Sequence, residues 1–261
     1  TRKESSAASD VYKRQAEKAG LPENIICWMD ESSIEMTQVM MREVNLILAT
    51  GGAGMVKAAY SSGTPAIGVG PGNCNVIFDD SCDIKNAVSS TIHSKTFDNG
   101  TICASEQSII CDEDMVPAVR AEMEKQGAYF LNESEREKLG RYILRANGTM
   151  NPEIVGRSVE TIARLAGLTD VPATARVLVA AEDGVGRGHP YSNEKLGLIL
   201  AYYVEDSEEA VLRRCVEILE WEGAGHTFAI HTEDADTAKR FAAAVPASRV
   251  PVSYTHLRAH E

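Results

Sequence analysis

Short apolar runs alternate with amphipathic segments along most of this chain. Buried strands are expected at residues 24–29, 45–50, 65–70, 75–78, 108–111, 176–181, 199–204 and 227–232. Apolar residues at helical spacing predict helices over residues 32–44, 114–125, 133–146, 207–222 and 235–244. A further helix is expected from Asp83 to the turn pair Asn99-Gly100, and a short helix after the glycines of "GGAGM". Strands that alternate with helices predict an α/β fold with a largely parallel sheet.

The ends of individual elements carry local signals. Ser134 and Glu137 have the spacing of a capping box at the start of the helix over residues 133–146. The polar start, residues 1–15, and the finish "SYTHLRAHE", residues 253–261, join the pattern abruptly. We interpret both ends as foreign translated sequence and exclude them from the functional reading, although genuine disordered tails have the same composition.

Net charge and cysteine content argue against several classes of protein. The 261 residues carry a formal net charge of −12, which argues against nonspecific nucleic-acid binding and against a polybasic membrane anchor. No apolar run approaches the roughly 20 residues of a membrane helix. The six cysteines form no CxxC pair, so we expect reduced thiols in a cytoplasmic protein. No cluster of His, Cys and Asp has metal-ligand spacing, so no metal is expected, and His93 and His189 receive no role.

Cys103 is the first candidate for chemistry. It lies in "SKTFDNGTICASEQSIICDE", on the short connection between an expected helix and an expected strand. A cysteine there can project into a cleft with backbone N–H groups around it, as a nucleophile needs. Cysteine is also a common buried residue. The residues alone leave both interpretations open.

Three further features have a functional and a structural interpretation. The glycines of "TGGAGM" lie between a strand and a helix, where backbone N–H groups can approach a phosphate or simply form a turn. Glu194 is either a ribose-binding carboxylate or an exposed loop charge. His226 follows two glycines and precedes a strand, as a proton-transfer group or as a satisfied core histidine. Asn99 is expected to shape its turn, and Glu106 to orient the loop.

Residues 16–252 resemble the CoA-acylating aldehyde dehydrogenases, which include the aldehyde domain of bifunctional aldehyde–alcohol dehydrogenases and stand-alone acetaldehyde or succinate-semialdehyde relatives. The resemblance is carried by "KTFDNGTICASEQS", by "ILATGGAGMVKAAYSSGTPAIGVGPGN" upstream, and by "NEKLGLILAYY" and "GAGHTFAIHTED" downstream. It implies that Cys103 is the nucleophile, that Glu194 binds the nicotinamide ribose, and that His226 moves a proton. It also implies contacts of NAD with Thr50, Gly51, Gly52 and Gly54.

One position departs from the wider superfamily. Hydrolytic aldehyde dehydrogenases carry a water-activating glutamate in an "ELGGK" stretch, and matching their "PNII" to "CNVI" places Gly68 there. Without a carboxylate base, attack of water on a thioester is poorly catalysed, so a thiol acceptor is favoured. Gly68 is also readily interpreted as a strand glycine that allows close backbone approach.

The resemblance implies a partial chain: residues 16–69 as the end of a Rossmann-type nucleotide-binding domain and residues 70–252 as an incomplete α/β catalytic domain. Cys103, Glu194 and His226 should line the cleft between these domains. The implied activity is the NAD-dependent interconversion of a short-chain aldehyde and its acyl-CoA, with coenzyme A as co-substrate, in a homo-oligomeric full-length protein. A hydrolytic aldehyde or semialdehyde dehydrogenase, and a non-catalytic assembly fragment of a bifunctional enzyme, remain the alternatives.

Overall fold

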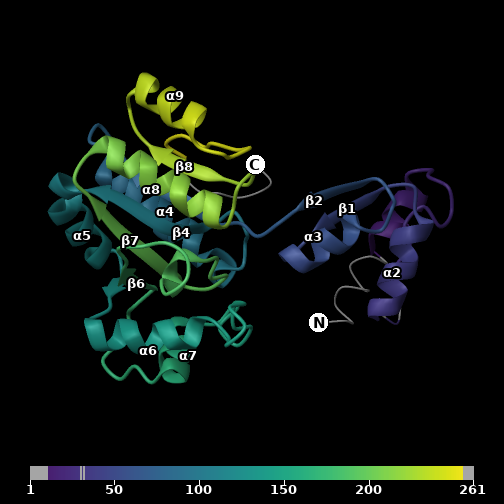
Figure 1. The fold of residues 1–261 in the computed structure, drawn as a ribbon, viewed down its shortest axis with the longest axis horizontal. Helices are drawn as coiled ribbons and strands as arrows, with labels where there is room; N and C mark the ends of the chain where they lie inside the picture. The colour runs from purple at the N-terminus through teal and green to yellow at the C-terminus, as the bar shows by residue number, and fades with distance from the viewer. Residues whose placement is uncertain (1–10, 30, 32, 255–261) are drawn as a thin grey trace. The chain divides into compact units, whose positions relative to one another are not determined.

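The computed structural model describes residues 11–29, 31 and 33–254. The chain divides into two compact units between Gly68 and Val69. Each unit is described by itself, and Figure 1 labels its helices and strands.

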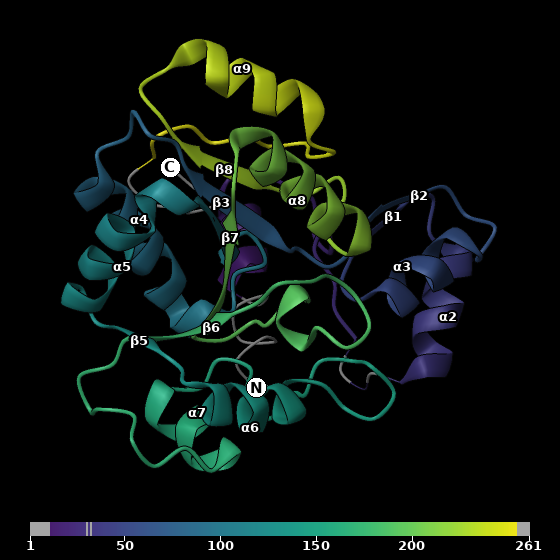
Figure 2. The same ribbon diagram turned by 60° about the vertical axis from the view of Figure 1, so that its left-hand side comes forward.

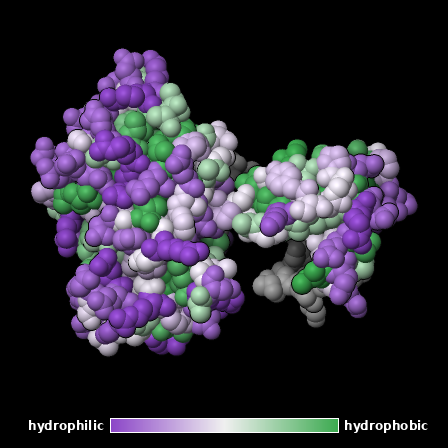
Figure 3. Space-filling model, in the orientation of Figure 1, coloured by the Kyte–Doolittle hydropathy of each residue, from purple (hydrophilic) through white to green (hydrophobic). Residues whose placement is uncertain are grey.

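Among its described residues, the smaller unit contains a helical segment at residues 11–18, two further helices and a two-stranded sheet. Helix α2 (Ile34–Glu43) and helix α3 (Ala53–Tyr60) accompany strands β1 (Ile47–Thr50) and β2 (Ala66–Val69). A small core forms where Met41, Ile47, Ala49 and Ala59 are buried together. Alternate residues of β1 are exposed, and Figure 3 shows hydrophobic surface on this unit. The sheet therefore buries one face against its helices and leaves the other uncovered.

The strand expected at residues 24–29 is absent, and that prediction is wrong. Asn24 lies in a turn, Ile25 and Ile26 lie in a bend, and residues 27–29 have no regular structure. Asn24 adopts a left-handed backbone with φ of +62°, and its carbonyl oxygen accepts a bond from Cys27 Sγ at 3.2 Å. A local turn of this kind cannot extend into a strand, and a short apolar run by itself does not distinguish the two.

The larger unit is built on a six-stranded sheet, as the alternating pattern predicted (Figure 1). Its order is β5-β6-β7-β4-β3-β8, and every pair of neighbours is parallel. The strands are β3 (Cys74–Phe78), β4 (Glu106–Asp112), β5 (Ala128–Phe130), β6 (Val177–Ala181), β7 (Ile199–Glu205) and β8 (Phe228–His231). Ile230 also forms a parallel bridge with Val252, so the chain returns to the sheet beside β8.

Helices cover both faces of this sheet, which Figure 2 shows from a second side. Successive strand residues point to opposite faces. On β3, Val76 and Phe78 join one core cluster with helices α4 (Ile84–Thr96) and α5 (Val116–Lys125). Ile77 joins the other cluster, with the remaining four helices of this unit. These are α6 (Glu133–Ile143), α7 (Val159–Ala166), α8 (Glu208–Trp221) and α9 (Ala235–Ala244). Burial on both faces explains why the strands read as continuous apolar runs.

Two elements and one helix cap were misjudged from sequence. Strand β5 and helix α7 were not expected, because three and eight residues give little periodicity to detect. The capping box of α6 is formed by Asn132 and Glu135 rather than by Ser134 and Glu137. Asn132 accepts from Glu135 N, and the Glu135 carboxylate accepts from Asn132 N, so the helix begins two residues earlier than the Ser–Glu spacing indicated.

The chain ends also differ from expectation. Residues 1–10 and 255–261 lie outside the described residues, and residues 11–18 are helical. Ser253 and Tyr254, inside the segment set aside, belong to the folded unit. Ser253 Oγ donates to Thr232 O at 2.7 Å, and the Tyr254 hydroxyl donates to Glu106 Oε1. The Tyr254 ring lies 4.5 Å from that of His231, centroid to centroid. The folded body therefore extends at least to residue 254.

Candidate active site

Four loops meet at one edge of the six-stranded sheet. Gly72 precedes β3, Cys103 precedes β4, Glu194 precedes β7 and His226 precedes β8. These strands are consecutive neighbours in the order β7-β4-β3-β8. Because they are all parallel, the segments that lead into them lie at the same edge of the sheet.

Gly72 lies close to Cys103, Glu194 and His226. Its N–H donates to Glu194 Oε1 at 2.9 Å. A Cβ atom at this position would lie 2.0 Å from the carbonyl oxygen of Cys103 and 3.3 Å from His226 Nε2. Cys103, Glu194 and His226 are thus brought together across more than one hundred residues of chain. Sequence reasoning did not single out Gly72, whose signal was its place in the "GPGN" turn before a strand.

Cys103 lies in a tight turn and is half-buried. Ser105 N donates to Ile102 O at 2.9 Å and closes the turn just before β4. Upstream, Asp98, Asn99 and Gly100 adopt positive φ values of 48°, 51° and 74° in succession. Such conformations persist only where the surroundings hold them.

Asn99 shapes this turn, as expected, because its Nδ2 donates to Gly156 O at 3.1 Å. At Gly100 a Cβ would lie 2.7 Å from Gly197 O, so only glycine fits. The connection that carries Cys103 is therefore held by contacts from residues far along the chain.

The electrostatic surroundings favour a neutral site. Burial, followed by the charge of Glu194, raises the pKa of the Cys103 thiol, whereas Arg249 lowers it. Burial and then Arg249 lower the pKa of His226, so its imidazole is neutral at neutral pH. Burial raises the pKa of Glu194 to about 7, against the lowering effect of the Gly72 N–H. A thiol therefore lies beside two groups that can accept a proton.

The glycine turn expected to contact a dinucleotide lies in the smaller unit, between β1 and α3. Thr50 ends β1, and Gly52 is the N-cap of α3 without a side-chain cap. A Cβ at Gly52 or Gly54 would meet no atom within 4 Å, whereas at Gly51 it would lie 3.0 Å from Met55 Sδ. Open space at an uncapped helix start suits a phosphate or ribose group.

Gly68 has a clear packing role on β2. A Cβ at this position would lie 2.6 Å from Val56 Cγ1 and 3.0 Å from the Tyr60 ring, both on α3. Its N–H donates to the Tyr60 hydroxyl at 3.0 Å. The absence of a side chain thus permits α3 to lie close against β2, as the strand-glycine interpretation predicted.

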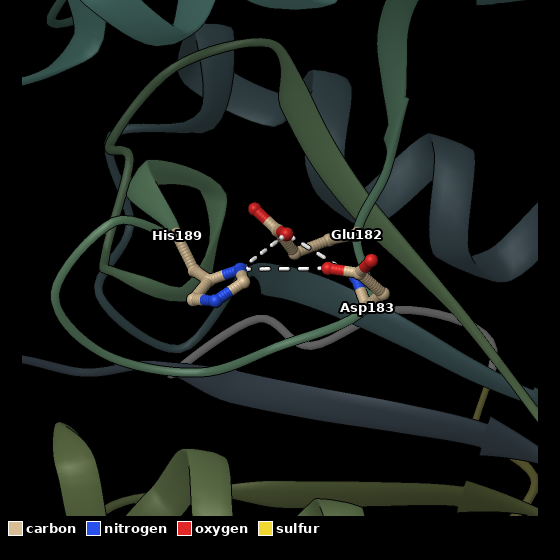
Figure 4. A group of neighbouring side chains, drawn as sticks. All are labelled: Glu182, Asp183 and His189. Carbon is tan, nitrogen blue, oxygen red and sulfur yellow. Dashed lines mark hydrogen bonds and ion pairs between the residues drawn. The ribbon is translucent and has the colours of Figure 1, made fainter.

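A group of potential metal ligands was missed from sequence. Glu182, Asp183 and His189 lie together on the loop between β6 and β7 (Figure 4). His189 Nδ1 lies 2.8 Å from Glu182 Oε1 and 3.6 Å from Asp183 Oδ1. Loop conformation and not a fixed spacing assembles this group, so the sequence pattern could not reveal the contacts of His189. The expectation that no metal is bound stays a prediction. The His189–Glu182 contact already satisfies both groups as a hydrogen-bonded pair.

Among the helices that the structure describes, none is both long enough and apolar enough to cross a bilayer.

Known proteins show clear similarity to this chain. Residues 3–138 match the profile of the aldehyde dehydrogenase family, and the match begins within the N-terminal segment that the sequence pattern set aside. The aldehyde-alcohol dehydrogenase of Clostridium acetobutylicum is 44% identical over 255 residues, which cover 97% of this chain and 29% of that protein.

Two solved structures share the fold. An acetylating aldehyde dehydrogenase from Geobacillus thermoglucosidasius superposes with a TM-score of 0.90 at 43% identity, covering 95% of this chain and 55% of that one. A propionaldehyde dehydrogenase from Rhodopseudomonas palustris, with bound CoA and an acylated cysteine, gives 0.82 at 26% identity, covering 92% and 54%. The chain thus spans about half, or less, of the length of these relatives. With a profile match over half of its residues, it belongs to the aldehyde dehydrogenase family.

Proposed function

We propose that this chain carries the cysteine and most of the surrounding active site of a CoA-acylating aldehyde dehydrogenase, which interconverts a short-chain aldehyde and its acyl-CoA. The observation that supports this most directly is the meeting of Cys103, Glu194 and His226 around Gly72. The Rhodopseudomonas relative, with CoA bound and its cysteine acylated, supports a covalent acyl intermediate.

Cys103 is the proposed nucleophile. Its thiol is protonated at neutral pH because burial raises its pKa, so attack on an aldehyde carbonyl requires a base. His226 is suited to that task, since its imidazole is neutral and Nε2 lies near the Cys103 turn. Its Nδ1 is held 3.0 Å from Thr227 Oγ1, which orients the ring. The product of attack is a thiohemiacetal on Cys103, whose oxidation leaves a thioester.

The proposed cofactor is NAD, which accepts the hydride from the thiohemiacetal carbon when bound. Glu194 is proposed to accept hydrogen bonds from the hydroxyls of its nicotinamide ribose. The turn of Thr50, Gly51, Gly52 and Gly54 is proposed to hold the adenosine and pyrophosphate part. Space at Gly52 and Gly54 supports this assignment, because backbone N–H groups can approach the phosphates there.

Coenzyme A, rather than water, is the proposed acceptor of the acyl group. No carboxylate is available at Gly68 to activate water, and the contact with Val56 leaves no room for one. A thiol is itself a good nucleophile and needs only deprotonation, for which His226 is placed. This distinguishes the proposal from a hydrolytic aldehyde or semialdehyde dehydrogenase.

The six cysteines are unpaired, which fits a reducing compartment. We therefore propose a cytoplasmic location for the full-length protein. The family resemblance further supports the proposal that it acts on small molecules as a homo-oligomer.

Acyl transfer from acyl-CoA tests the proposal without requiring the nicotinamide cofactor. The chain is incubated with acetyl-CoA or propionyl-CoA, and acylated peptides are identified by mass spectrometry. Acylation is expected at Cys103 and is lost in Cys103→Ser, whereas the matched variant Cys82→Ser, which changes another half-buried thiol, keeps it. Equal labelling of the other cysteines, or none at Cys103, contradicts the assignment. Release of free acid from aldehyde and NAD without CoA supports the hydrolytic alternative instead.

A further inference from the structure

Three fully buried polar side chains of the larger unit belong to segments that border the proposed active site. Lys95 comes from α4, Gln107 from β4, and Lys195 from the loop before β7. Lysine is almost never fully buried without partners, and burial of its charge is costly. Two buried lysines around one buried glutamine therefore call for an explanation beyond core packing.

Gln107 joins three segments through hydrogen bonds. Its Oε1 accepts from Lys95 Nζ at 3.2 Å and from the backbone N–H of Lys195 at 3.1 Å. Its Nε2 donates to the carbonyl oxygen of Ser105 at 3.3 Å. Lys195 Nζ donates to the carbonyl oxygens of Tyr191 and Asn193 at 2.5 and 2.8 Å. A single amide therefore ties the turn after Cys103 to the loop that carries Glu194.

We propose that Gln107 is a positioning residue that holds the Glu194 carboxylate beside Cys103. Ser105 is two residues after the cysteine, and Lys195 directly follows the glutamate, so each bond acts on the segment next to a site residue. The importance of this arrangement for catalysis rests on the proposed function. The hydrogen bonds by which Gln107 connects the two segments do not depend on it.

The side-chain chemistry at each position fits this role. Glutamine offers both an acceptor and a donor, and here the acceptor serves Lys95 and Lys195 while the donor serves Ser105. Burial and then the charge of Glu222 raise the pKa of Glu194, whereas Lys95 and Lys195 lower it. Burial in turn lowers the pKa of both lysines. Loss of the amide frees the glutamate loop and weakens the influence of the carboxylate on the thiol.

The pH profile of Cys103 alkylation by iodoacetamide, followed peptide by peptide, measures that influence. Because the charge of Glu194 raises the pKa of the thiol, Glu194→Gln should lower it and speed alkylation near neutral pH, by up to about tenfold for each unit of pKa. Gln107→Met has similar length and removes all three bonds of the amide. It should change the rate in the same direction as Glu194→Gln.

The decisive comparison is the double variant. Gln107→Met should add no further rate increase once Glu194 is already Gln, because its effect passes through that carboxylate. Gln126→Met, which changes a glutamine at the end of α5, is the matched control and should leave the profile unchanged. If Gln107→Met unfolds the chain, Gln107→Asn, one methylene shorter, gives the same comparison.

Additive effects in the double variant, or a lower Tm with an unchanged profile, would make Gln107 an ordinary core residue and overturn the inference. Failure of the wild-type chain to take up an acyl group from acyl-CoA bears on the proposed function alone. The two outcomes are therefore separable.

Discussion

Replacing Gly72 by alanine tests the packing that brings the candidate site together. The new Cβ would lie 2.0 Å from the carbonyl oxygen of Cys103 and 2.9 Å from its carbonyl carbon. Gly72 is not among the glycines with positive φ, so the alanine backbone itself is unstrained. The effect of the substitution is therefore purely steric, and it falls on the turn that carries the candidate nucleophile.

The magnitude follows from the atoms involved. An ordinary contact begins at 3.4 Å, so the 2.0 Å separation must open by more than 1 Å. Both atoms that the Cβ would meet here belong to the backbone, so no side chain can rotate away. Overpacking costs typically about 1–3 kcal/mol, and this contact belongs at the upper end. For a unit of this size, that corresponds to a fall in Tm of roughly 6–12 °C. A misplacement of about 1 Å should also reduce acylation of Cys103 by roughly 100-fold.

The assay combines thermal unfolding with acyl transfer from acetyl-CoA. Gly70→Ala is the matched control, because a Cβ two residues earlier meets no atom within 4 Å. It should retain wild-type Tm and acylation. If Gly72→Ala unfolds and reacts like Gly70→Ala, the Cys103 turn does not pack against Gly72, and the geometry on which the site depends is refuted.

Three further changes give separate tests. Gly68→Glu should lower the free energy of unfolding of the smaller unit in urea by about 2–4 kcal/mol, because its Cβ would lie 2.6 Å from Val56 Cγ1. Adding Val56→Ala should restore part of that free energy. Burial raises the pKa of Glu106 to about 7, so its native state binds a proton more tightly than the unfolded chain, and stability should fall as pH rises from about 4.5 to 7. Glu106→Gln should remove about 1–3 kcal/mol of that decrease, and an unchanged pH dependence would contradict the burial argument. Tyr254→Phe removes the hydroxyl that donates to the Glu106 carboxyl, so it should destabilise the folded protein more at pH 8 than at pH 5, by about 1–2 kcal/mol. No effect at either pH would mean that residue 254 is not part of the folded unit.

Local patterns were sufficient for most elements of the larger unit. The runs that became β4 and β7 are apolar at consecutive positions because both faces of the sheet are covered. The serine and aspartate that cap α8 and α9 are visible in the sequence as well. At residues 24–29 a local turn at Asn24 followed by irregular backbone replaces the expected strand. Tyr254 is held by Glu106 and His231, far along the chain, and no local pattern indicates these contacts.

The candidate site divides in the same way. The sequence alone determined the α/β alternation and the turn before β4, and the resemblance of its cysteine segment pointed to Cys103, Glu194 and His226. Only the tertiary structure decided that these residues meet, that Gly72 is the contact between them, and that Gln107 ties their loops together. Helical and strand periodicities express interactions between residues a few positions apart. The strand order β7-β4-β3-β8 depends instead on packing over both faces of the sheet, summed across residues more than one hundred positions apart, and no single segment contains that information.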